Sequence, residues 1–308
     1  MKFSLSAILI LVFIVAAQYA VYGQKRPEGL RMPKDIFKNF AGYKDDDGKY
    51  YFEGEGYNII ITTYAKPPTQ ANFKKVADQI EGRKKVIVKA LNNDPLQNYV
   101  LDMSSNKSDP PVIVRNFLIA GRNNDILEVG IARYNSLDPR LTNEIVSSIF
   151  YDSIYAPILV DTKNGVIDFI GRRIKFDDDC FWLKPHVIKC TNTGEITWYQ
   201  FNSLAEAEGY RQTELAIARK AIKKRMAEAD TVRVIFEGKE TLSDRLLFDS
   251  DAIGLIFNSN RLVNAYYIAA EIRGRFVYCR LVFSDIAMKS NDPESGLPRL
   301  IARFMRFK

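Results

Sequence analysis

Histidine and cysteine are scarce in this chain, which has one histidine and three cysteines among its 308 residues. A zinc centre rich in histidine is therefore excluded. Cys180, His186 and Cys190 stand close together, but their spacing matches no known zinc finger and no fourth ligand is evident. A nucleophile and base made of Cys180 and His186 would lack any supporting motif. We therefore predict no metal ligand and no cofactor.

Motifs of nucleotide and acyl chemistry are missing as well. The chain has no GxSxG elbow, no phosphate-binding Walker loop and no dinucleotide fingerprint. Two acidic runs, Asp45 to Asp47 and Asp177 to Asp179, lack the alternating spacing and terminal glutamate of a calcium-binding loop. We expect solvated turns at both runs and no catalytic residue. The alternative is a hydrolase or metal-dependent enzyme that uses acidic residues near Asp177 to Asp179.

Charge is absent from Phe3 to Gln24, directly after Lys2. Within this segment Ser6 to Ala17 is almost continuously apolar, and small residues precede a cut after Gly23. A positive start, an apolar centre and a cleavable end are typical of a signal peptide, which we assign to residues 1–23. A retained anchor is the alternative, because the uncharged run is just long enough to cross a bilayer. We expect a protein exported to the periplasm or the cell exterior, with no membrane span after cleavage.

Apolar residues, by contrast, are plentiful. They make up 47% of the chain, and aromatic residues make up 12%, which is enough for the cores of about two domains. Two stretches, 112–152 and 262–308, each run as strand, tight turn, strand, loop and amphipathic helix. In the later one, Val277, Cys279 and Leu281 recur at every second position, which predicts a strand with one buried face. A helix is then needed to cover that face.

We therefore predict an α+β fold of two related units, each a mainly antiparallel sheet with helices packed on one face. After an N-terminal arm at 24–42, the first unit covers 43–157 and the second covers 158–308. The second unit contains an inserted long helix near 203–228, which Ser203 and Glu206 begin as a capping box. This order of elements resembles small α+β binding modules of the PsbP type. The resemblance is one of topology, and it implies no particular site residues.

The three cysteines of an exported protein leave at least one unpaired within a monomer. Cys279 lies on the apolar face of its predicted strand, so we expect it in the core. Cys180 and Cys190 could close a short loop as a disulfide or stay unpaired, because the sequence does not supply the geometry of such a bond.

Two groups of residues are candidates for binding. The long helix carries a basic row, Arg219, Lys220, Lys223 and Lys224, in which like charges stand four residues apart and repel. A partner would relieve this repulsion, although a solvated face is the simpler alternative. Trp182 and Trp198 could form an aromatic platform for a ligand, or could belong to the core.

The formal net charge of +7 selects no single partner. We predict an exported, non-enzymatic binding or interaction protein whose partner is a protein or an anionic envelope component. No nucleic-acid-binding motif accompanies the basic row. An immunity-type inhibitor of a secreted toxin is a further alternative. The sequence makes no prediction about the oligomeric state.

Overall fold

The computed structural model describes residues 39–45, 47–81, 87–90, 99–105, 110–121, 123–150, 165–191, 194–223, 225–249, 262–284, 292 and 295–308. These residues form two compact units, 39–150 and 165–308. The predicted signal peptide, 1–23, and Lys224 of the basic row lie outside the described residues. Within the described residues no helix is long and apolar enough to span a membrane.

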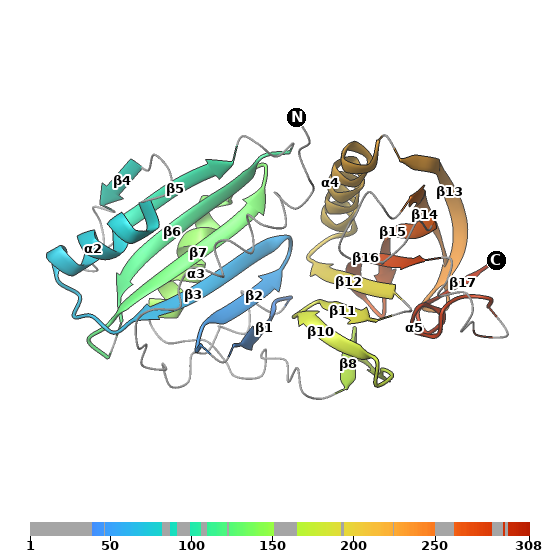
Figure 1. Cartoon of the computed structure of the whole chain (residues 1–308), viewed down its shortest axis with the longest axis horizontal. Helices are drawn as coiled ribbons and strands as arrows, with labels where there is room; N and C mark the ends of the chain where they lie inside the picture. The colour runs from blue at the N-terminus through green and yellow to red at the C-terminus, as the bar shows by residue number, and fades with distance from the viewer. Residues whose placement is uncertain are drawn as a thin grey trace. The chain divides into compact units, whose positions relative to one another are not determined.

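The first unit is one antiparallel sheet with two helices (Figure 1). Its strands lie side by side in the order β1-β2-β3-β7-β6-β5-β4. Its elements are β1 (Ala41–Lys44), β2 (Tyr50–Gly54), β3 (Tyr57–Tyr64), α2 (Gln70–Glu81), β4 (Ile87–Ala90), β5 (Tyr99–Ser105), β6 (Val112–Ala120), β7 (Ile126–Tyr134) and α3 (Pro139–Phe150).

The second unit has a larger sheet, in the order β10-β11-β12-β16-β15-β14-β13-β17, and a separate hairpin of β8 with β9. Its elements are β8 (Val166–Phe169), β9 (Arg172–Lys175), β10 (Cys180–Lys184), β11 (Val187–Cys190), β12 (Gly194–Phe201), α4 (Leu204–Ile222), β13 (Met226–Phe236), β14 (Lys239–Asp249), β15 (Leu262–Ile272), β16 (Arg275–Ser284), α5 (Arg299–Ala302) and β17 (Met305–Phe307).

Both large sheets follow the same path. Three strands form a meander, a helix crosses over, and four more strands return until the last one pairs with the third. Thus β7 lies beside β3 in the first unit, and β16 lies beside β12 in the second. The strand pairs are antiparallel throughout these sheets, so the α+β fold with mainly antiparallel sheets is confirmed.

Four of the hairpins turn through the same dipeptide pattern, any residue followed by glycine with positive φ at both. The pairs are Glu55-Gly56, Ile170-Gly171, Glu237-Gly238 and Arg273-Gly274. Positive φ at both central positions defines the turn whose twist matches that of the flanking strands, and glycine supplies the second position without strain. The tight turn predicted within 262–308 is confirmed, and it lies at Arg273-Gly274.

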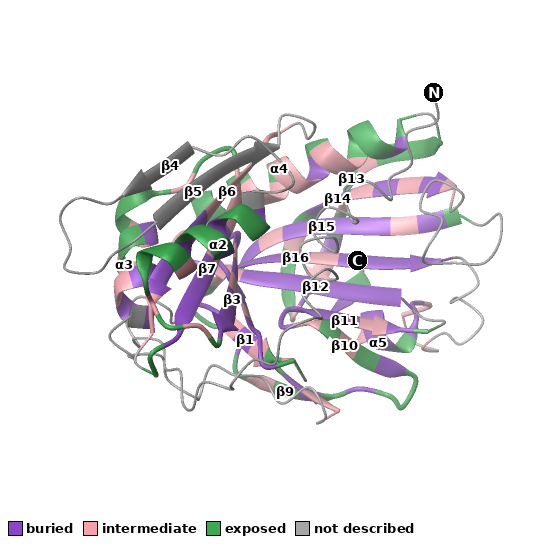
Figure 2. Cartoon of the chain, turned by 60° about the vertical axis from the view of Figure 1, so that its left-hand side comes forward, coloured by how far each residue is buried: buried purple, intermediate pink, exposed green. Residues whose placement is uncertain are grey.

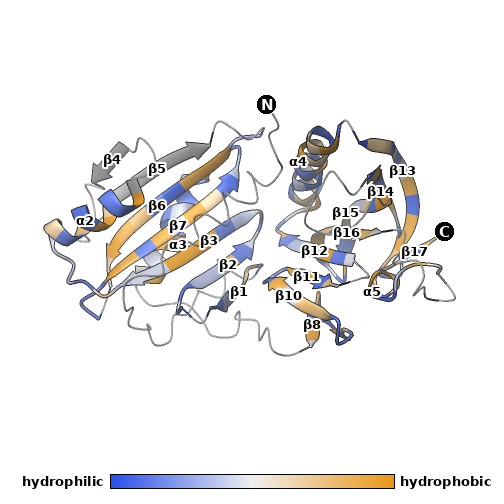
Figure 3. Cartoon of the chain, viewed as in Figure 1, coloured by the Kyte–Doolittle hydropathy of each residue, from blue (hydrophilic) through white to orange (hydrophobic). Residues whose placement is uncertain are grey.

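Helices cover both faces of the first sheet, which corrects the prediction that they pack on one face. Leu118 packs with Phe73 and Val76 of α2, whereas its neighbour Ile119 packs with Ile145 of α3. Successive residues of a strand point to opposite faces, and both Leu118 and Ile119 are fully buried. The apolar run from Phe117 to Ala120, which lies in β6 after Arg115 and Asn116, is typical of a strand buried on both faces, and Figure 3 shows the hydrophobic parts of β6.

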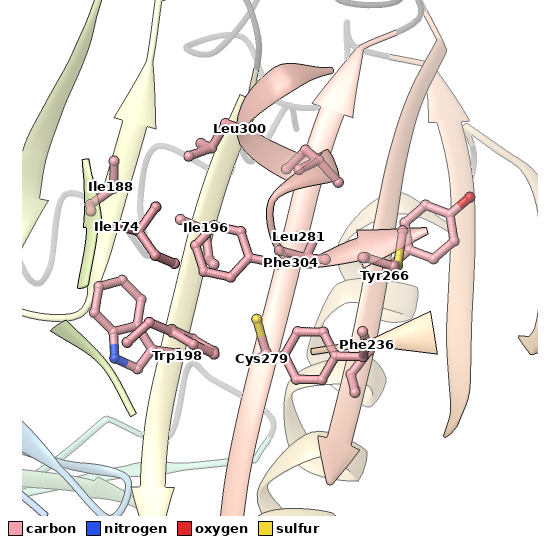
Figure 4. Close-up of a cluster of buried hydrophobic side chains, with 14 of the residues drawn as sticks. Ile174, Ile188, Ile196, Trp198, Phe236, Tyr266, Cys279, Leu281, Leu300 and Phe304 are labelled. Atoms are coloured by element: carbon pink, nitrogen blue, oxygen red, sulfur yellow. The ribbon is translucent and has the colours of Figure 1, made fainter. Parts of the chain in front are cut away.

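The second sheet is covered in the same way. Tyr267 belongs to the cluster under α4, whereas Ile268 belongs to the cluster under α5 and the β8–β9 hairpin. Figure 4 shows the latter cluster, which includes Ile174, Ile188, Ile196, Trp198, Phe236, Tyr266, Cys279, Leu281, Leu300 and Phe304. The helices of this unit therefore also lie on opposite faces, and the prediction of a single covered face is wrong for both units.

Two element boundaries also differ from the prediction. The side chain of Ser203 accepts the amide of Glu206 as predicted, but α4 ends at Ile222, well before residue 228. Met226, which we counted in the helix, instead begins β13 and pairs with Phe248. At the other end of the chain, Phe40 is buried in the first core, so the last residues assigned to the N-terminal arm belong to the first unit.

A buried carboxylate fastens the β8–β9 hairpin to the second sheet. Glu237, in the β13–β14 turn, forms ion pairs with Arg172 of β9 and with Arg273 of the β15–β16 turn, and its side chain is 2% exposed. Arg273 also donates to the carbonyls of Phe169 and Ile170 in the hairpin. One acidic side chain thus ties together three separate turns of the chain.

Glu237→Ala should lower the free energy of unfolding by about 3 kcal/mol, because removing one partner of a buried ion pair leaves the other charges uncompensated. Urea denaturation followed by tryptophan fluorescence would measure the change. The control is Glu240→Ala, whose exposed side chain pairs with Arg233 and Lys308 and whose loss should have little effect. Equal destabilisation by both variants would contradict the assigned role of Glu237.

Candidate functional site

A short motif recurs in the third strand of each large sheet. Residues 61–64 of β3 read Ile-Thr-Thr-Tyr, and residues 196–199 of β12 read Ile-Thr-Trp-Tyr. In β3, Thr62 lies opposite Glu128 of β7. In β12, Thr197 lies opposite Arg280 of β16. Each sheet therefore carries an ionisable residue at the matching position, on the face that the crossover helix covers.

Pairing within the last hairpin of each sheet gives the same correspondence between Glu128 and Arg280. Ile119 pairs with Leu127, and the next pair along the ladder contains Glu128. Ile268 pairs with Cys279, and the next pair contains Arg280. Our comparison of the two stretches in the sequence matched the hairpins as wholes, but it did not pair Glu128 with Arg280 and did not reach the third strands. The isoleucine, threonine and tyrosine shared by residues 61–64 and 196–199 were the sequence signal that relates the third strands.

Glu128 is buried in the first unit, where it is 6% exposed. Tyr64 donates its hydroxyl to Oε2 of Glu128 at 2.7 Å. Burial raises the pKa of Glu128 to about 7, against the hydrogen bond from Tyr64 and the charge of Lys49, which both favour the carboxylate. This side chain can therefore gain or lose a proton near neutral pH.

Arg280 occupies the matching position in the second unit, and here the charges are paired. Its guanidinium donates to Glu195 at 2.8 Å and to the Thr197 hydroxyl at 3.4 Å, and it lies 3.6 Å from Glu214 of α4. Burial alone would disfavour the charge, but Glu195 and its neighbours outweigh it and raise the pKa of Arg280 well above the usual value. The cluster joins two strands to the crossover helix.

A second ion pair fixes α4 to the sheet. Arg211 of α4 pairs with Asp244 of β14 and also donates to Glu208 of its own helix. Because Arg211 and Glu214 both face the sheet, α4 is anchored by charge as well as by Leu215 and Ile222, which are buried beneath it. The helix is thus held to the sheet through one face, and residues of its opposite face are exposed.

The basic row lies on that opposite face. Arg219, Lys220 and Lys223 are exposed at the C-terminal end of α4, and Arg225 is exposed just beyond it (Figure 2). Cations at this end interact favourably with the helix dipole, which offsets their mutual repulsion. The structure therefore groups the described members of the row on one surface, which we call the basic end of α4.

The two tryptophans proposed for binding lie in or against the core. Trp198 is 3% exposed and packs against Phe169 at 5.7 Å between ring centres. Trp182 is partly buried and lies 6.0 Å from Trp198. Phe181, the neighbour of Trp182, reaches the surface and is 47% exposed. Trp198 accordingly stabilises the core and is not available to a ligand.

The histidine and the cysteines are inaccessible. His186 is 2% exposed, with the rings of Trp198 and Tyr199 about it, and burial lowers the pKa of His186 to about 3. Cys180 and Cys190 form a disulfide between β10 and β11. Cys279 is unpaired and buried, and burial raises the pKa of its thiol well above the usual value. None of these groups can serve as an accessible nucleophile or base.

The two acidic runs do not occupy matching places. Asp45 and Asp47 follow β1, whereas Asp177 to Asp179 precede β10. Asp177 forms an ion pair with Arg303 at 3.0 Å. The Asp179 carboxylate lies within 4.8 Å of the sulfurs of Cys180 and Cys190, but those sulfurs are bonded to each other and offer no thiolate to a metal.

Comparison with known proteins identifies no family for this chain. No family model matches the chain, and no curated protein matches it. Among solved structures, the chain has a match described as the di-domain ARO/CYC StfQ from the steffimycin biosynthetic pathway. The sequences are 10% identical, the match covers 75% of this chain and 85% of that one, and the TM-score is 0.13. This likeness supports no conclusion about function.

The pKa of Glu128 predicts a pH-dependent stability for the first unit. The folded state holds a proton that the unfolded chain releases above its ordinary value of 4.5, so the free energy of unfolding should be highest below that pH. It should fall by up to about 3 kcal/mol as the pH rises through 7. Urea denaturation of wild type and Glu128→Gln across this range would measure the difference between them. Tyr64→Phe should extend the loss to higher pH, and a wild-type curve parallel to that of Glu128→Gln would contradict the assignment.

Replacing Arg280 should destabilise the second unit by an amount that does not change with pH near neutrality. Arg280→Met leaves Glu195 and Glu214 facing each other without their shared cation, and we expect a loss of about 2 kcal/mol, since Arg280 is partly exposed. Adding Glu195→Gln and Glu214→Gln should recover part of the loss. Thermal denaturation would show both effects, and no recovery would mean that packing of the arginine stem dominates.

Proposed function

We propose that this protein is an exported, non-enzymatic binding protein that presents the basic end of α4 to a protein or an anionic envelope component. The observation that carries the proposal is the inaccessibility of the reactive side chains. The chain has one histidine and three cysteines, and all four are buried or joined in a disulfide. Catalysis that uses a cysteine thiolate as nucleophile or a histidine as base would find none of these side chains accessible to a substrate.

The Cys180–Cys190 disulfide supports export, because such bonds persist mainly outside the reducing cytosol. The proposed cleavage after Gly23 would deliver the mature chain to that environment. An immunity-type inhibitor of a secreted toxin would be one form of this function, with an acidic toxin surface as the partner.

The basic end of α4 is suited to binding because it is both exposed and rigidly mounted. The ion pairs of Arg211 and Arg280 hold the inner face of the helix against the sheet. A surface that is already ordered loses little conformational entropy when a partner binds. Positive charge on such a surface attracts phosphate, sulfate or carboxylate groups and speeds their encounter.

We further propose that the two units arose by duplication of one module. Their common strand order, the repeated isoleucine, threonine and tyrosine of β3 and β12, and the matching places of Glu128 and Arg280 support this origin. On this view the crossover helix was lengthened in the second unit, from 12 residues in α2 to 19 in α4, and it is the longer helix that carries the basic end.

The alternative of an enzyme using Asp177 to Asp179 has less support. The carboxylate of Asp177 is occupied by Arg303, and consecutive exposed aspartates are typical of a solvated turn. Metal analysis of the purified protein would restore this alternative if it found a stoichiometric ion.

The charge of α4 can be tested against a matched control. Arg219→Glu/Lys223→Glu reverses two exposed charges at the basic end, and Lys74→Glu/Lys75→Glu reverses two exposed charges on α2. Binding to immobilised heparin, and to phosphatidylcholine vesicles with and without phosphatidylglycerol, is the measurement. Each basic residue near an anionic surface contributes about 1 kcal/mol, so the α4 variant should bind at least about tenfold more weakly than wild type.

The two probes separate a soluble polyanion from a lipid surface as the preferred class of partner. The α2 variant should keep most of the wild-type affinity for whichever probe binds. Equal losses in the two variants would show a response to net charge alone, and no binding of wild type to either probe would reject an anionic partner.

A further inference from the structure

One edge of the second sheet is open along the first part of β13. β17 is the last strand in the order of that sheet, but it pairs only with residues 234–236 of β13. Among the described residues, no other segment pairs with the outer side of residues 228–232, which form a regular ladder with β14 on their inner side. Such an edge offers backbone groups to which an extended segment of another molecule can bond.

The register shows which residues of this edge direct their backbone groups outward. The amide of Glu237 donates to the carbonyl of Phe304, on the side of β17. Residues of a strand alternate between bonding to one neighbour and to the other, and the ladder has no irregularity between Glu228 and Glu237. Thr231 and Ala229 therefore direct their N–H and C=O groups to the outer side. Within the part of the chain that the structure describes, these outward groups have no partner.

The side chains of the same two residues lie on the face that α4 covers. Ala229 lies opposite Leu246 of β14, which belongs to the cluster under α4. Thr231 lies opposite Asp244, which pairs with Arg211 of α4. Opposite residues of neighbouring strands point to the same face. Both side chains are small and exposed, so longer side chains of an added strand can lie across them.

Positive charge flanks these two small residues. Lys223 caps the end of α4 and Arg225 directly precedes β13, and both are exposed. Arg233 follows Thr231 by two residues, so it lies on the same face. It pairs with Glu240 at 3.0 Å, and its side chain is still 69% exposed. The α4 face of this edge is therefore suited to carboxylates.

The other face of the same edge is acidic. Glu228 and Asp230 lie opposite Leu247 and Arg245, and both carboxylates pair with Arg245. Acidic side chains of an added strand would be repelled on this face, and pairing with a second copy about Asp230 would bring the carboxylates of both copies together. Acidic residues are thus favoured at every second position of an added strand only.

We propose that the open edge of β13 binds an extended segment of a protein partner as an added antiparallel strand, in which acidic residues alternate with apolar or basic ones. Its backbone bonds to Ala229 and Thr231, and its acidic side chains lie on the α4 face between Arg225 and Arg233. The proposal deepens the proposed function and rests on it. The basic end of α4 attracts the acidic segment, and the edge fixes its extended backbone.

The edge is ordered before a partner arrives. The hydroxyl of Thr231 bonds to the carboxylate of Asp244 at 3.2 Å, and Arg245 donates to both oxygens of Asp230 at 2.9 and 2.7 Å. A strand that is already ordered loses little entropy on pairing. Because the interface is small, we expect a dissociation constant on the order of 100 µM.

A pair of fluorescein-labelled hexapeptides tests the alternation. Each peptide contains three glutamates and three valines, which alternate in one peptide and are grouped by type in the other. Their net charges are equal, so attraction to the basic end alone would bind them equally. Fluorescence anisotropy should show that the alternating peptide binds wild type and that the grouped peptide binds at least about fivefold more weakly.

Thr231→Pro tests the backbone pairing. It removes the outward donor and no bond to β14, because proline is tolerated at an edge position whose N–H faces outward. The alternating peptide should bind at least about tenfold more weakly to this variant. The matched control is Thr231→Ala, which loses only the hydroxyl bonded to Asp244 and should bind as wild type does. Ala229→Pro removes the equivalent donor and is the second variant if circular dichroism shows that Thr231→Pro does not fold.

Undiminished binding of the alternating peptide to the folded proline variants would overturn the added strand. Equal affinity for the two peptides would also overturn it and would leave attraction by the basic end intact. Binding of wild type to heparin but to neither peptide would reject the protein segment and keep the proposed anionic partner. Peptide binding that Thr231→Pro weakens and Arg219→Glu/Lys223→Glu leaves unchanged would reject the role of α4 and keep the strand.

Discussion

The pairing of β12 with β16 is the constraint on which the second unit depends. Seven residue pairs, from Glu195 with Val282 to Phe201 with Phe276, join strands that are far apart in the sequence. The ladder unites the first meander with the last hairpin and obliges α4 to cross the sheet between them. It also sets Arg280 beside Thr197, within reach of Glu195 and Glu214. The pairing of β3 with β7 plays the same part in the first unit.

Local features of the fold were visible in the sequence because they depend on near neighbours. The capping of α4 by Ser203, the turn at Arg273-Gly274 and the burial of Cys279 each follow from a few adjacent residues. The two covered faces were misjudged because the alternation of Val277, Cys279 and Leu281 in β16 was taken to mean one buried face, whereas Tyr278 and Val282 of the same strand are buried on the other. The apolar run from Phe117 to Ala120 in β6 pointed instead to burial on both sides.

The candidate site was harder to anticipate, because the pairs that form it are distant in the chain. Nothing local to Glu128 shows that Tyr64 will donate to it, and nothing local to Arg280 shows that α4 will bring Glu214 near. Trp198 illustrates the reverse difficulty. Its type is as suitable for a ligand platform as for a core, and only the ladder with β16, together with the hairpin that packs over it, decides between them.

The long ladder between β12 and β16 also bears on how the chain reaches its fold. Hairpins such as β13–β14 and β15–β16 close through short turns and can form early, whereas β12 gains its second neighbour only after the chain through β16 is available. Until then β12 has an open, apolar side that is prone to misassociation. The proposed export adds to this effect. A polypeptide that crosses a membrane unfolded, N-terminus first, would expose the apolar side of β12 on the far side before the β13–β14 and β15–β16 hairpins emerge.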